Sequence, residues 1–468
     1  MPMPFDDFER FVVVGLGMSG RAAVRALIDR ELEVAVFHHL ESGVEPDDEL
    51  VAFAAGLSAS GTRVTLGGTD LSLLDWADVV VASPGLPPTN FFLKAAVERG
   101  IRVWSELELG WRLSRAPVIA ITGTNGKTTT TTLVTDILES AGIPAISAGN
   151  IGVPFVEVVR HHTEGRTIVC EVSSFQLYFI DQFRPRVAVV LNLGDDHYDW
   201  HPGFADYLAA KARITENQGD EDTLIVNAFD PACLQIAEGS KARLSVFGGS
   251  EIHEIRSTAG SRLTRTPEVI AGCSAGRIEL HHPGGVSDLM PISDIRLQGA
   301  HNLENVLAAA AVCSEYHVQA SDFSRAVSSF HGLPHRMAFV REVGSIRYID
   351  DSKATNPHAA MMALKDTRDV VLIGGGQDRG LDLSPLLEAR DRLKGLVVMG
   401  ETAEKLEKLF AGMVPIESAD SIEDAVVLAA ELASPGDTVL LSPGCASWDQ
   451  YSSYAERGDR FQRAVMAL

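Results

Sequence analysis

The chain has 468 residues, 46% of them hydrophobic and 22% charged, which is typical of a globular protein too long for one core and predicts about three domains. Its formal net charge of −23 argues against a surface for nucleic acid or an anionic membrane, because no basic cluster offsets the acidic residues. The five cysteines are widely spaced without a C-x-x-C pair, and the acidic start and short apolar runs resemble neither a signal peptide nor a membrane span, so we expect a cytoplasmic protein without a disulfide framework or zinc site.

The first segment alternates strand-like apolar runs with helical stretches, which is typical of a parallel α/β sheet. Residues 11–14 (FVVV) are followed by GLGMSG at residues 15–20, a G-x-G-x-x-G turn that indicates dinucleotide or diphosphate binding. The acidic residue that usually ends the next strand of an NAD site is missing, since Phe37, His38 and His39 stand there. The pattern therefore disfavours NAD and leaves open another diphosphate nucleotide or a plain tight turn.

A phosphate-binding loop is predicted at residues 118–129, VIAITGTNGKTT. An apolar strand that ends in such a turn before a helix directs backbone N–H groups at an anion, with Lys127 on the β/γ-phosphates and Thr128 on Mg²⁺. The match to the usual P-loop is imperfect, because Ile121 stands where the first glycine is expected and Gly123 comes two residues later. A surface turn that caps a helix is the alternative, but we interpret the stretch as a triphosphate site.

Acidic residues and histidines follow two further apolar runs of the second segment. Glu171 follows the apolar run at residues 167–170 within the predicted strand TIVCEV (167–172), where a carboxylate near the end of the strand is placed to hold Mg²⁺. A solvated carboxylate at the sheet edge is the alternative. The run at residues 187–193 leads into a cluster that favours metal binding or general-base chemistry. The members of this cluster are Asp195, Asp196, His197, Asp199 and His201.

Lys211 lies on a predicted helix, FADYLAAKARI, four residues after Tyr207. From composition alone it is a solvated lysine. A lysine buried beside a metal can instead be neutral and react with CO₂, and periodicity does not distinguish the two.

The rest of the chain continues the α/β pattern after one departure. Residues 247–291 are rich in Gly, Ser, Thr and His, which predicts a hairpin-rich excursion, and a helix is expected after His301. The third segment has strands with polar or glycine-rich ends, where open α/β sheets bind ligands. These strands are predicted at residues 346–349, 370–373, 396–399 and 438–441, with a helix at 401–410.

Eight motifs occur in an order that resembles the Mur ligases over nearly the whole chain. They are GTNGKTT, GNIG, CEVSSFQL, DDHYDWH with YLAAK, HNLENVLAA, GLPHR, DDSKATN and SPGCASWDQY. Within that family, SSFQL, DSKATN and the last motif are most similar to members that add glutamate.

The resemblance implies an α/β fold of three domains. These are a Rossmann-like N-terminal domain for a UDP-linked substrate (1–112), a central P-loop mononucleotide-binding domain with a parallel sheet for ATP (113–333), and a Rossmann-like C-terminal domain for glutamate (334–468). The implied reaction is ATP-dependent addition of D-glutamate to UDP-N-acetylmuramoyl-L-alanine through an acyl phosphate in peptidoglycan precursor synthesis, with release of ADP and phosphate. The resemblance also implies a monomer with small-molecule substrates and no nucleic-acid or membrane partner.

The resemblance further implies roles for individual residues. The expected ATP contacts are Gly123, Thr124, Asn125, Gly126, Lys127, Thr128, Thr129, Asn302, Arg336 and Asp351, with Asn305 a further candidate. Two Mg²⁺ ions are expected on Thr128, Glu171, His197 and a carbamylated Lys211; Lys127, Glu171, His197 and Lys211 form the expected catalytic set. The expected substrate contacts are Ser19, Asn150, Ser173 and Gln176 for the UDP-linked acceptor, and Lys353, Thr355, Arg379, Ser447 and Tyr454 for glutamate.

Four parts of the chain depart from the family pattern. Residues 37–40 stand where an acid, a hydroxyl and an arginine usually meet uracil, and Trp200 replaces a common arginine. Arg379 occupies the region where some members use a lysine for the glutamate carboxylate, and Tyr454 stands where phenylalanine is frequent. The chain does not reveal whether His197 or a neighbouring carboxylate accepts the proton of the attacking amine.

Several alternative functions remain open from the sequence. The nearest is a related ligase that adds L-glutamate or another amino acid, such as a sibling Mur ligase or a folylpolyglutamate synthase. A nucleotide-gated binding protein with slow ATPase activity is disfavoured by the acid and histidine strand ends. A dehydrogenase would depend on GLGMSG alone.

Overall fold

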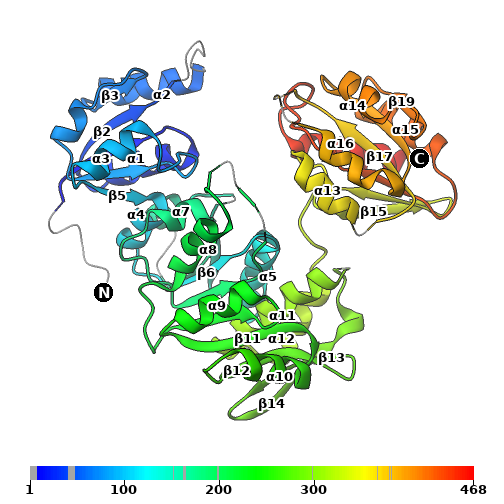
Figure 1. Cartoon of the computed structure of the whole chain (residues 1–468), viewed down its shortest axis with the longest axis horizontal. Coiled ribbons are helices and arrows are strands. Elements are labelled where there is room, and N and C mark those ends of the chain that lie inside the picture. Colours follow the sequence, from blue (N-terminus) through cyan, green and yellow to red (C-terminus); the bar gives the residue numbers. More distant parts are fainter. Residues whose placement is uncertain are drawn as a thin grey trace. The chain divides into compact units, whose positions relative to one another are not determined.

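The computed structural model describes residues 8–40, 48–150, 152–161, 165–194, 196–197, 200–297, 299–365, 367–378, 380 and 382–468. Three α/β regions follow one another along the chain, each built around its own sheet (Figure 1). They group into two compact units, residues 1–330 and 331–468. The predicted fold class is confirmed. In the described ranges, no helix is both long and apolar enough to cross a bilayer.

The first region has a parallel sheet with strand order β3-β2-β1-β4-β5, the order of Rossmann-type sheets. Side chains of β1 alternate between the two faces, so Phe11 and Val13 pack toward one helical layer and Val12 and Val14 toward the other. The strands are β1 (Arg10–Val14), β2 (Glu33–His38), β3 (Arg63–Leu66), β4 (Val79–Ala82) and β5 (Arg102–Ser105). The helices are α1 (Met18–Ile28), α2 (Asp48–Ala59), η1 (Ser72–Asp75), α3 (Phe91–Glu98) and α4 (Glu106–Leu113).

The second region has nine strands in the order β14-β13-β12-β11-β10-β9-β6-β8-β7, parallel from β12 to β7. Its strands are β6 (Val118–Thr122), β7 (Ala145–Gly149), β8 (Thr167–Glu171), β9 (Val187–Val190), β10 (Thr223–Asn227), β11 (Arg243–Glu251), β12 (Val269–Ser274), β13 (Arg277–His282) and β14 (Gly285–Pro291). Its helices are α5 (Lys127–Ser140), α6 (Phe155–His161), α7 (Ser174–Tyr178), α8 (Phe204–Ala212), η2 (Arg213–Thr215), α9 (Pro231–Gly239), α10 (Ile252–Arg262), η3 (Ile292–Asp294), α11 (Ala300–Glu315) and α12 (Ala320–Ser329).

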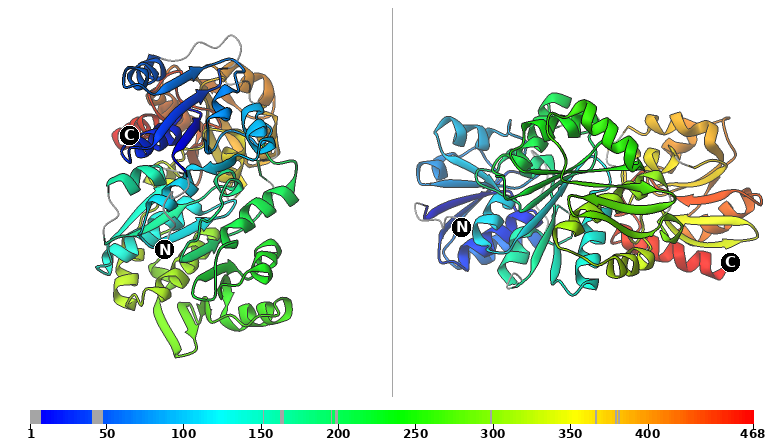
Figure 2. Two further views of the ribbon diagram at one scale, coloured as in Figure 1. Left: turned by 90° about the vertical axis from the view of Figure 1, so that its left-hand side faces the viewer. Right: turned by 90° about the horizontal axis from the view of Figure 1, so that it is seen from below.

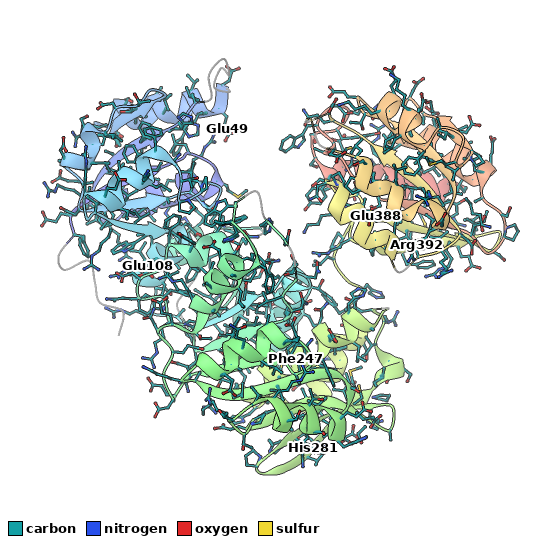
Figure 3. All side chains as sticks on the ribbon, viewed as in Figure 1. Glu49, Glu108, Phe247, His281, Glu388 and Arg392 are labelled. Carbon is teal, nitrogen blue, oxygen red and sulfur yellow. The ribbon has the colours of Figure 1, made fainter. Side chains whose placement is uncertain are left out.

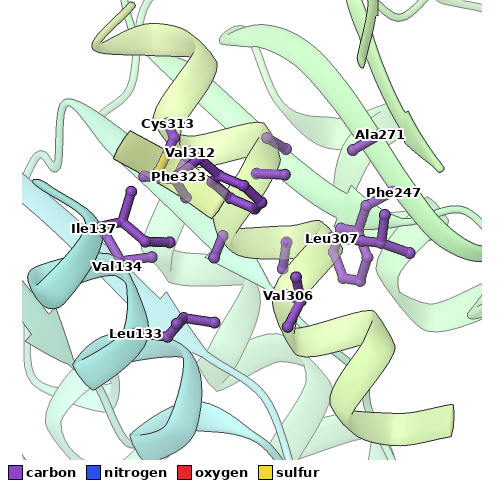
Figure 4. Packing of buried hydrophobic residues seen from close by; sticks show 14 of the residues in the cluster. Leu133, Val134, Ile137, Phe247, Ala271, Val306, Leu307, Val312, Cys313 and Phe323 are labelled. Atoms are coloured by element: carbon purple, nitrogen blue, oxygen red, sulfur yellow. The ribbon is translucent and has the colours of Figure 1, made fainter. Parts of the chain in front are cut away.

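Helices cover both faces of this sheet (Figure 2). On one face, α5, α11 and α12 pack Leu133, Leu307 and Phe323 against the strands (Figure 4). The other face buries side chains of α6, α7, α9 and α10. Burial on both sides explains why the central strands are continuous apolar runs in the sequence.

The hairpin-rich expectation for residues 247–291 is only partly right. β12, β13 and β14 form an antiparallel meander, but the helix α10 precedes it. Ile255 and Ala259 of α10 are buried in the core, so packing supports a helix whose Ser, Thr and Gly content is unfavourable.

The third region has six strands in the order β15-β16-β20-β17-β18-β19, of which β15 pairs antiparallel to β16. Helices again lie on both faces of the sheet. The strands are β15 (Ala338–Val343), β16 (Ile346–Asp350), β17 (Val370–Gly375), β18 (Leu393–Met399), β19 (Ile416–Ser418) and β20 (Thr438–Leu441). The helices are α13 (Pro357–Lys365), η4 (Ser384–Arg392), α14 (Ala403–Phe410), α15 (Ile422–Leu432) and α16 (Tyr454–Ala467).

Candidate active site

The carboxyl ends of three neighbouring strands carry the polar residues of the second region. β6 lies between β8 and β9, and these strands lead into Thr122, Glu171 and Asn192, respectively. The chain continues from β6 to β7 on one side of β6 and reaches β9 on the other. Such a switch point at the carboxyl ends is where open α/β sheets bind ligands.

The predicted phosphate loop joins β6 to α5 at this point. Gly126, with φ +83°, is the N-cap residue of α5, and a Cβ at this position would lie 2.2 Å from Asn305 Oδ1. The side chain of Asn192 shapes the loop, because its Oδ1 accepts a hydrogen bond from Asn125 N at 2.8 Å and its Nδ2 donates to Asn125 O at 3.2 Å. The stretch is therefore a fixed turn over the centre of the sheet.

Lys127 folds back over the loop it follows. Its Nζ donates to the carbonyl oxygens of Gly123 at 3.0 Å and Thr124 at 2.9 Å. The cation thus lies at the mouth of the turn and at the start of a 14-residue helix. A helix N-terminus combined with a lysine is suited to bind a polyphosphate.

Helix α11 brings two more predicted ATP contacts to this loop. Asn305 Oδ1 accepts from Thr130 Oγ1 at 3.3 Å, and Asn305 Nδ2 donates to Asn302 Oδ1 at 3.2 Å. Asn305 is buried, so it links α11 to α5. Asn302 is half-buried beside it.

Lys211 is buried, and the solvated position expected from composition is wrong. Its side chain crosses from α8 to the end of β6, where Nζ donates to Thr122 Oγ1 at 3.1 Å and to Gly123 O at 3.0 Å. Burial first, and then the positive charge of Lys127, hold the Lys211 pKa well below its ordinary value, while Asp196 and Glu171 oppose the shift. A buried amine without an ion pair to a carboxylate among the described residues favours its neutral form.

The hydrogen bonding of the Glu171 carboxylate indicates whether this site fits a metal ion. Its side chain is buried, and Oε1 accepts from Asn150 Nδ2 at 3.3 Å. Its Oε2 is buried without a hydrogen-bond partner among the described residues. Such an orphaned carboxylate oxygen is costly unless a ligand uses it, and an oxygen donor suits Mg²⁺.

The other predicted metal ligands give less support than Glu171 for a bound metal ion. No group of three or more His, Cys, Asp or Glu side chains suited to a metal occurs in the part of the chain that the structure describes. His197, at φ +54°, is exposed, and its backbone N donates to Asp196 Oδ1 at 2.9 Å. Asp195 and Asp199 lie outside the described residues.

His201 has a structural position. Its ring is buried, with Nδ1 2.6 Å from Asp206 Oδ2 and Nε2 2.9 Å from Ser174 Oγ.

The predicted contacts to the UDP-linked acceptor are divided between two regions. Ser173 and Gln176 form a capping box at the start of α7, and Asn150 N donates to Glu171 O at 2.9 Å, which brings these three residues to the ends of β7 and β8. Ser19 lies on α1 of the first region. There, His38 Nδ1 accepts from Leu16 N at 2.9 Å, so this histidine supports the glycine turn.

In the second unit, two loops that carry predicted glutamate contacts lie together. Arg457 of α16 joins them, because its Nε donates to Ser352 Oγ at 3.0 Å and its Nη2 to Cys445 O at 3.1 Å. Lys353 Nζ lies 5.9 Å from the ring centroid of Tyr454. The remaining members are Thr355, which donates from its N to Lys353 O at 2.9 Å, and buried Ser447; Arg379 lies outside the described residues.

Asp351, a predicted ATP contact in this second unit, is buried after β16. Its oxygens accept from Ser442 Oγ at 2.8 Å and Met337 N at 3.1 Å. Burial raises the pKa of Asp351 to about 7, although both hydrogen bonds and Arg336 lower it. Arg336 belongs to the same unit.

The sequence did not single out two residues that build these sites. Asn192 has no motif signal beyond its place after β9, and Arg457 lies on an amphipathic C-terminal helix. Their roles depend on partners that are 67 and 105 residues away in the chain. Only the position of Asn192 at a strand end could have drawn attention to it.

Comparison with known proteins agrees with this arrangement. Residues 9–105 match the model for the Mur ligase MurD-like N-terminal domain, residues 121–313 the Mur ligase middle domain, and residues 335–445 the Mur ligase glutamate ligase domain. The chain belongs to the Mur ligase family.

Curated relatives of this Mur ligase match it from end to end. A UDP-N-acetylmuramoylalanine–D-glutamate ligase from Geobacillus kaustophilus is 39% identical, covering 100% of this chain and 99% of the relative. A protein of the same name from Salinibacter ruber is 40% identical, with 98% of each chain covered.

Solved structures agree in fold. MurF from Acinetobacter baumannii superposes with a TM-score of 0.58 at 18% identity, covering 98% of this chain and 94% of that one. Escherichia coli FolC gives 0.53 at 20% identity over 77% and 92%. At these identities the likeness concerns the fold alone.

Proposed function

We propose that this Mur ligase joins D-glutamate to UDP-N-acetylmuramoyl-L-alanine at the expense of ATP, releasing ADP and phosphate. The observation that carries the proposal is the match over the whole chain, at 39% identity, to curated proteins named for that reaction. The phosphate loop with Lys211 and Glu171 beside it supplies a site of the required chemistry. The proposal includes a cytoplasmic monomer that makes peptidoglycan precursors and acts on small molecules rather than on nucleic acid or membrane.

The three predicted domains divide the substrates among them. Residues 1–112 would bind the UDP part of the acceptor, residues 113–333 would bind ATP, and residues 334–468 would bind glutamate. The family descriptions support this division, since the C-terminal match is to a glutamate ligase domain. The UDP-linked acceptor would be contacted by Ser19, Asn150, Ser173 and Gln176.

Activation of the acceptor carboxylate is the first chemical step. An amine does not displace oxide from a carboxylate, so the carboxylate first takes the γ-phosphoryl group of ATP and becomes an acyl phosphate. Phosphoryl transfer requires positioning and charge neutralisation. The residues for this are the loop from Gly123 to Thr129, with Lys127 on the β/γ-phosphates, and Asn302, Arg336 and Asp351 on the nucleoside and phosphate.

The residues that would hold Mg²⁺ are Thr128, Glu171, His197 and a carbamylated Lys211. The orphaned Oε2 of Glu171 supports a metal there, and the burial of Lys211 supports its modification. Mg²⁺ bound at these residues would neutralise phosphate charge. The carbamate would convert a buried cation into an anion and remove its repulsion of the metal.

Capture by glutamate completes the reaction. Lys353, Thr355, Arg379, Ser447 and Tyr454 would orient the amino acid so that its unprotonated amine attacks the acyl carbonyl. Phosphate then leaves with the pair of electrons of the C–O bond. His197 and Asp196 are the candidate acceptors for the amine proton, since both lie in the stretch that follows β9.

The test is product formation by the purified chain with ATP, Mg²⁺ and UDP-N-acetylmuramoyl-L-alanine, comparing D-glutamate, L-glutamate and no amino acid. The proposal predicts phosphate and a new amide with D-glutamate only. Equal turnover with L-glutamate would indicate the related ligase. Equal phosphate release without any amino acid, and no amide, would contradict the proposal.

A further inference from the structure

Glu106 is a buried carboxylate that connects three segments far apart in the sequence. It is the first residue of α4 and is 1% exposed. Its Oε1 accepts from Val156 N at 2.6 Å, and its Oε2 accepts from Gln176 Nε2 at 3.3 Å. Val156 lies in α6 and Gln176 in α7, so one carboxylate joins both helices to α4.

The contact to Gln176 fixes the orientation of that amide. Gln176 Oε1 accepts from both Ser173 N and Ser173 Oγ, each at 3.0 Å. Because the backbone N–H of Ser173 can only donate, the amide oxygen must face Ser173 and the amide nitrogen must face Glu106. Both lone pairs of Oε1 are then used, which leaves the buried Gln176 side chain one further N–H and no free acceptor.

The contact to Val156 fixes the helix that follows the GNIG loop. Gly110 lies one turn after Glu106 on α4, and a Cβ there would be 2.9 Å from Phe155 Cδ1 and 3.1 Å from Val156 N. The absence of a side chain at Gly110 therefore lets α6 approach the carboxylate. The loop before α6 contains Asn150, another proposed acceptor contact.

A buried carboxylate at position 106 has an unfavourable desolvation energy. Burial raises the pKa of Glu106 to about 7 even though Val156 N and the Gln176 amide lower it. A glutamine at position 106 would have nearly the same shape and no charge to desolvate. The N–H groups of its amide would, however, face the N–H groups of the Gln176 amide. Only an acceptor at both oxygens satisfies the two donors.

We propose that Glu106 is a positioning residue for the UDP-linked acceptor, holding the Gln176 amide so that its remaining N–H meets an acceptor oxygen of that substrate, and holding α6 behind Asn150. This inference rests on the proposed function. The proposed role of Glu106 differs from a purely structural one, because it affects the binding of only one of the three substrates. Glu108, two residues along α4 (Figure 3), has a structural environment instead: it accepts from the backbone of Asp181 and Phe183 at 2.9 and 2.8 Å.

The test compares Glu106→Gln with the exposed control Glu98→Gln in steady-state kinetics at pH 8. We expect the KM for UDP-N-acetylmuramoyl-L-alanine to rise at least about tenfold in Glu106→Gln, the loss expected for one misplaced charge-assisted hydrogen bond. The KM values for ATP and D-glutamate should change by less than about twofold, as should kcat. The thermal midpoint should stay close to that of the wild type, because the cost of the donor left without an acceptor is offset by the charge that is no longer buried.

Gly110→Ala is the second variant, since it displaces α6 and leaves the carboxylate intact. It should raise the same KM selectively. An unchanged acceptor KM in Glu106→Gln would overturn the inference, as would an equal rise of all three KM values together with a lower thermal midpoint. A wild-type protein that makes no product from this acceptor would instead refute the proposed function, so the two failures are distinguishable.

Discussion

Lys211 Nζ lies 3.0 Å from the carbonyl oxygen of Gly123, which places a buried lysine directly beneath the phosphate loop. The same nitrogen contacts Thr122 Oγ1 at the end of β6. An ammonium at this position would add to the charge of Lys127 and repel a cation. The proposed carbamate on Lys211 reverses that sign, and its chemistry can be tested separately from its packing.

Lys211→Ala should reduce turnover at least about 100-fold, comparable to loss of one electrostatic contact in other active sites. Formate or acetate should restore part of the activity by placing a carboxylate in the vacated space. Phosphate release is the measurement, and the exposed Lys241→Ala is the control that should keep full activity. A Lys211→Ala protein that is fully active without added carboxylate would rule out a carbamate that holds the metal.

Gly126→Ala tests the geometry of the phosphate loop. The substitution adds strain at φ +83° and a Cβ 2.2 Å from Asn305 Oδ1, so ADP affinity should fall at least about tenfold and stability by about 1–3 kcal/mol. Calorimetric titration with ADP and thermal unfolding measure the two effects.

Gly142→Ala is the matched control for Gly126. It has a similar φ of +75° at the other end of α5, and nothing lies within 4 Å of its added Cβ. It should lose stability but keep its affinity for ADP. Equal loss of ADP affinity in the two variants would show that helix strain, rather than the loop, is responsible.

Glu171→Gln tests the orphaned carboxylate oxygen. The shape is kept and the charge is lost, so the protein should fold while the Mg²⁺ concentration for half-maximal activity rises at least about tenfold. Titration of activity with MgCl₂ is the measurement, and the exposed Glu139→Gln on α5 is the control. An unchanged Mg²⁺ requirement would remove Glu171 from the metal site.

Asp351→Asn should change the dependence of stability on pH. Folded Asp351 has a pKa raised to about 7 from 3.8, so the folded state keeps a proton that the unfolded chain has lost between these values. Its stabilising contribution is therefore complete below pH 4 and is lost as pH rises to about 7. The thermal midpoint of the variant, relative to wild type, should rise between pH 4 and pH 7 and then level off. A difference that stays constant from pH 4 to pH 7 would contradict the assignment.

Parallel strands buried on both faces made much of the fold predictable. The run TIVCEV and the stretch before GTNGKTT are apolar because helices cover both sides, and each contains a strand of the structure, β8 and β6, respectively. Helix α10 was missed because its Ser, Thr and Gly residues favour turns, whereas Ile255 and Ala259 stabilise it through contacts made only in the folded chain.

The site was predictable where chemistry lies within a motif and not where it depends on distant partners. Lys127 follows from its glycine-rich turn. The burial of Lys211 depends on Thr122, 89 residues earlier, and no local pattern reports that. The linking roles of Glu106 and Arg457 likewise exist only once separate helices have packed together.

The central claim is that ATP converts the acceptor carboxylate into an acyl phosphate before glutamate is joined. Its most direct test uses UDP-N-acetylmuramoyl-L-alanine labelled with ¹⁸O in both carboxylate oxygens, with mass analysis of the phosphate released alongside the product. The account predicts one ¹⁸O atom in each phosphate and one in the new amide. Formation of the amide with unlabelled phosphate would contradict it.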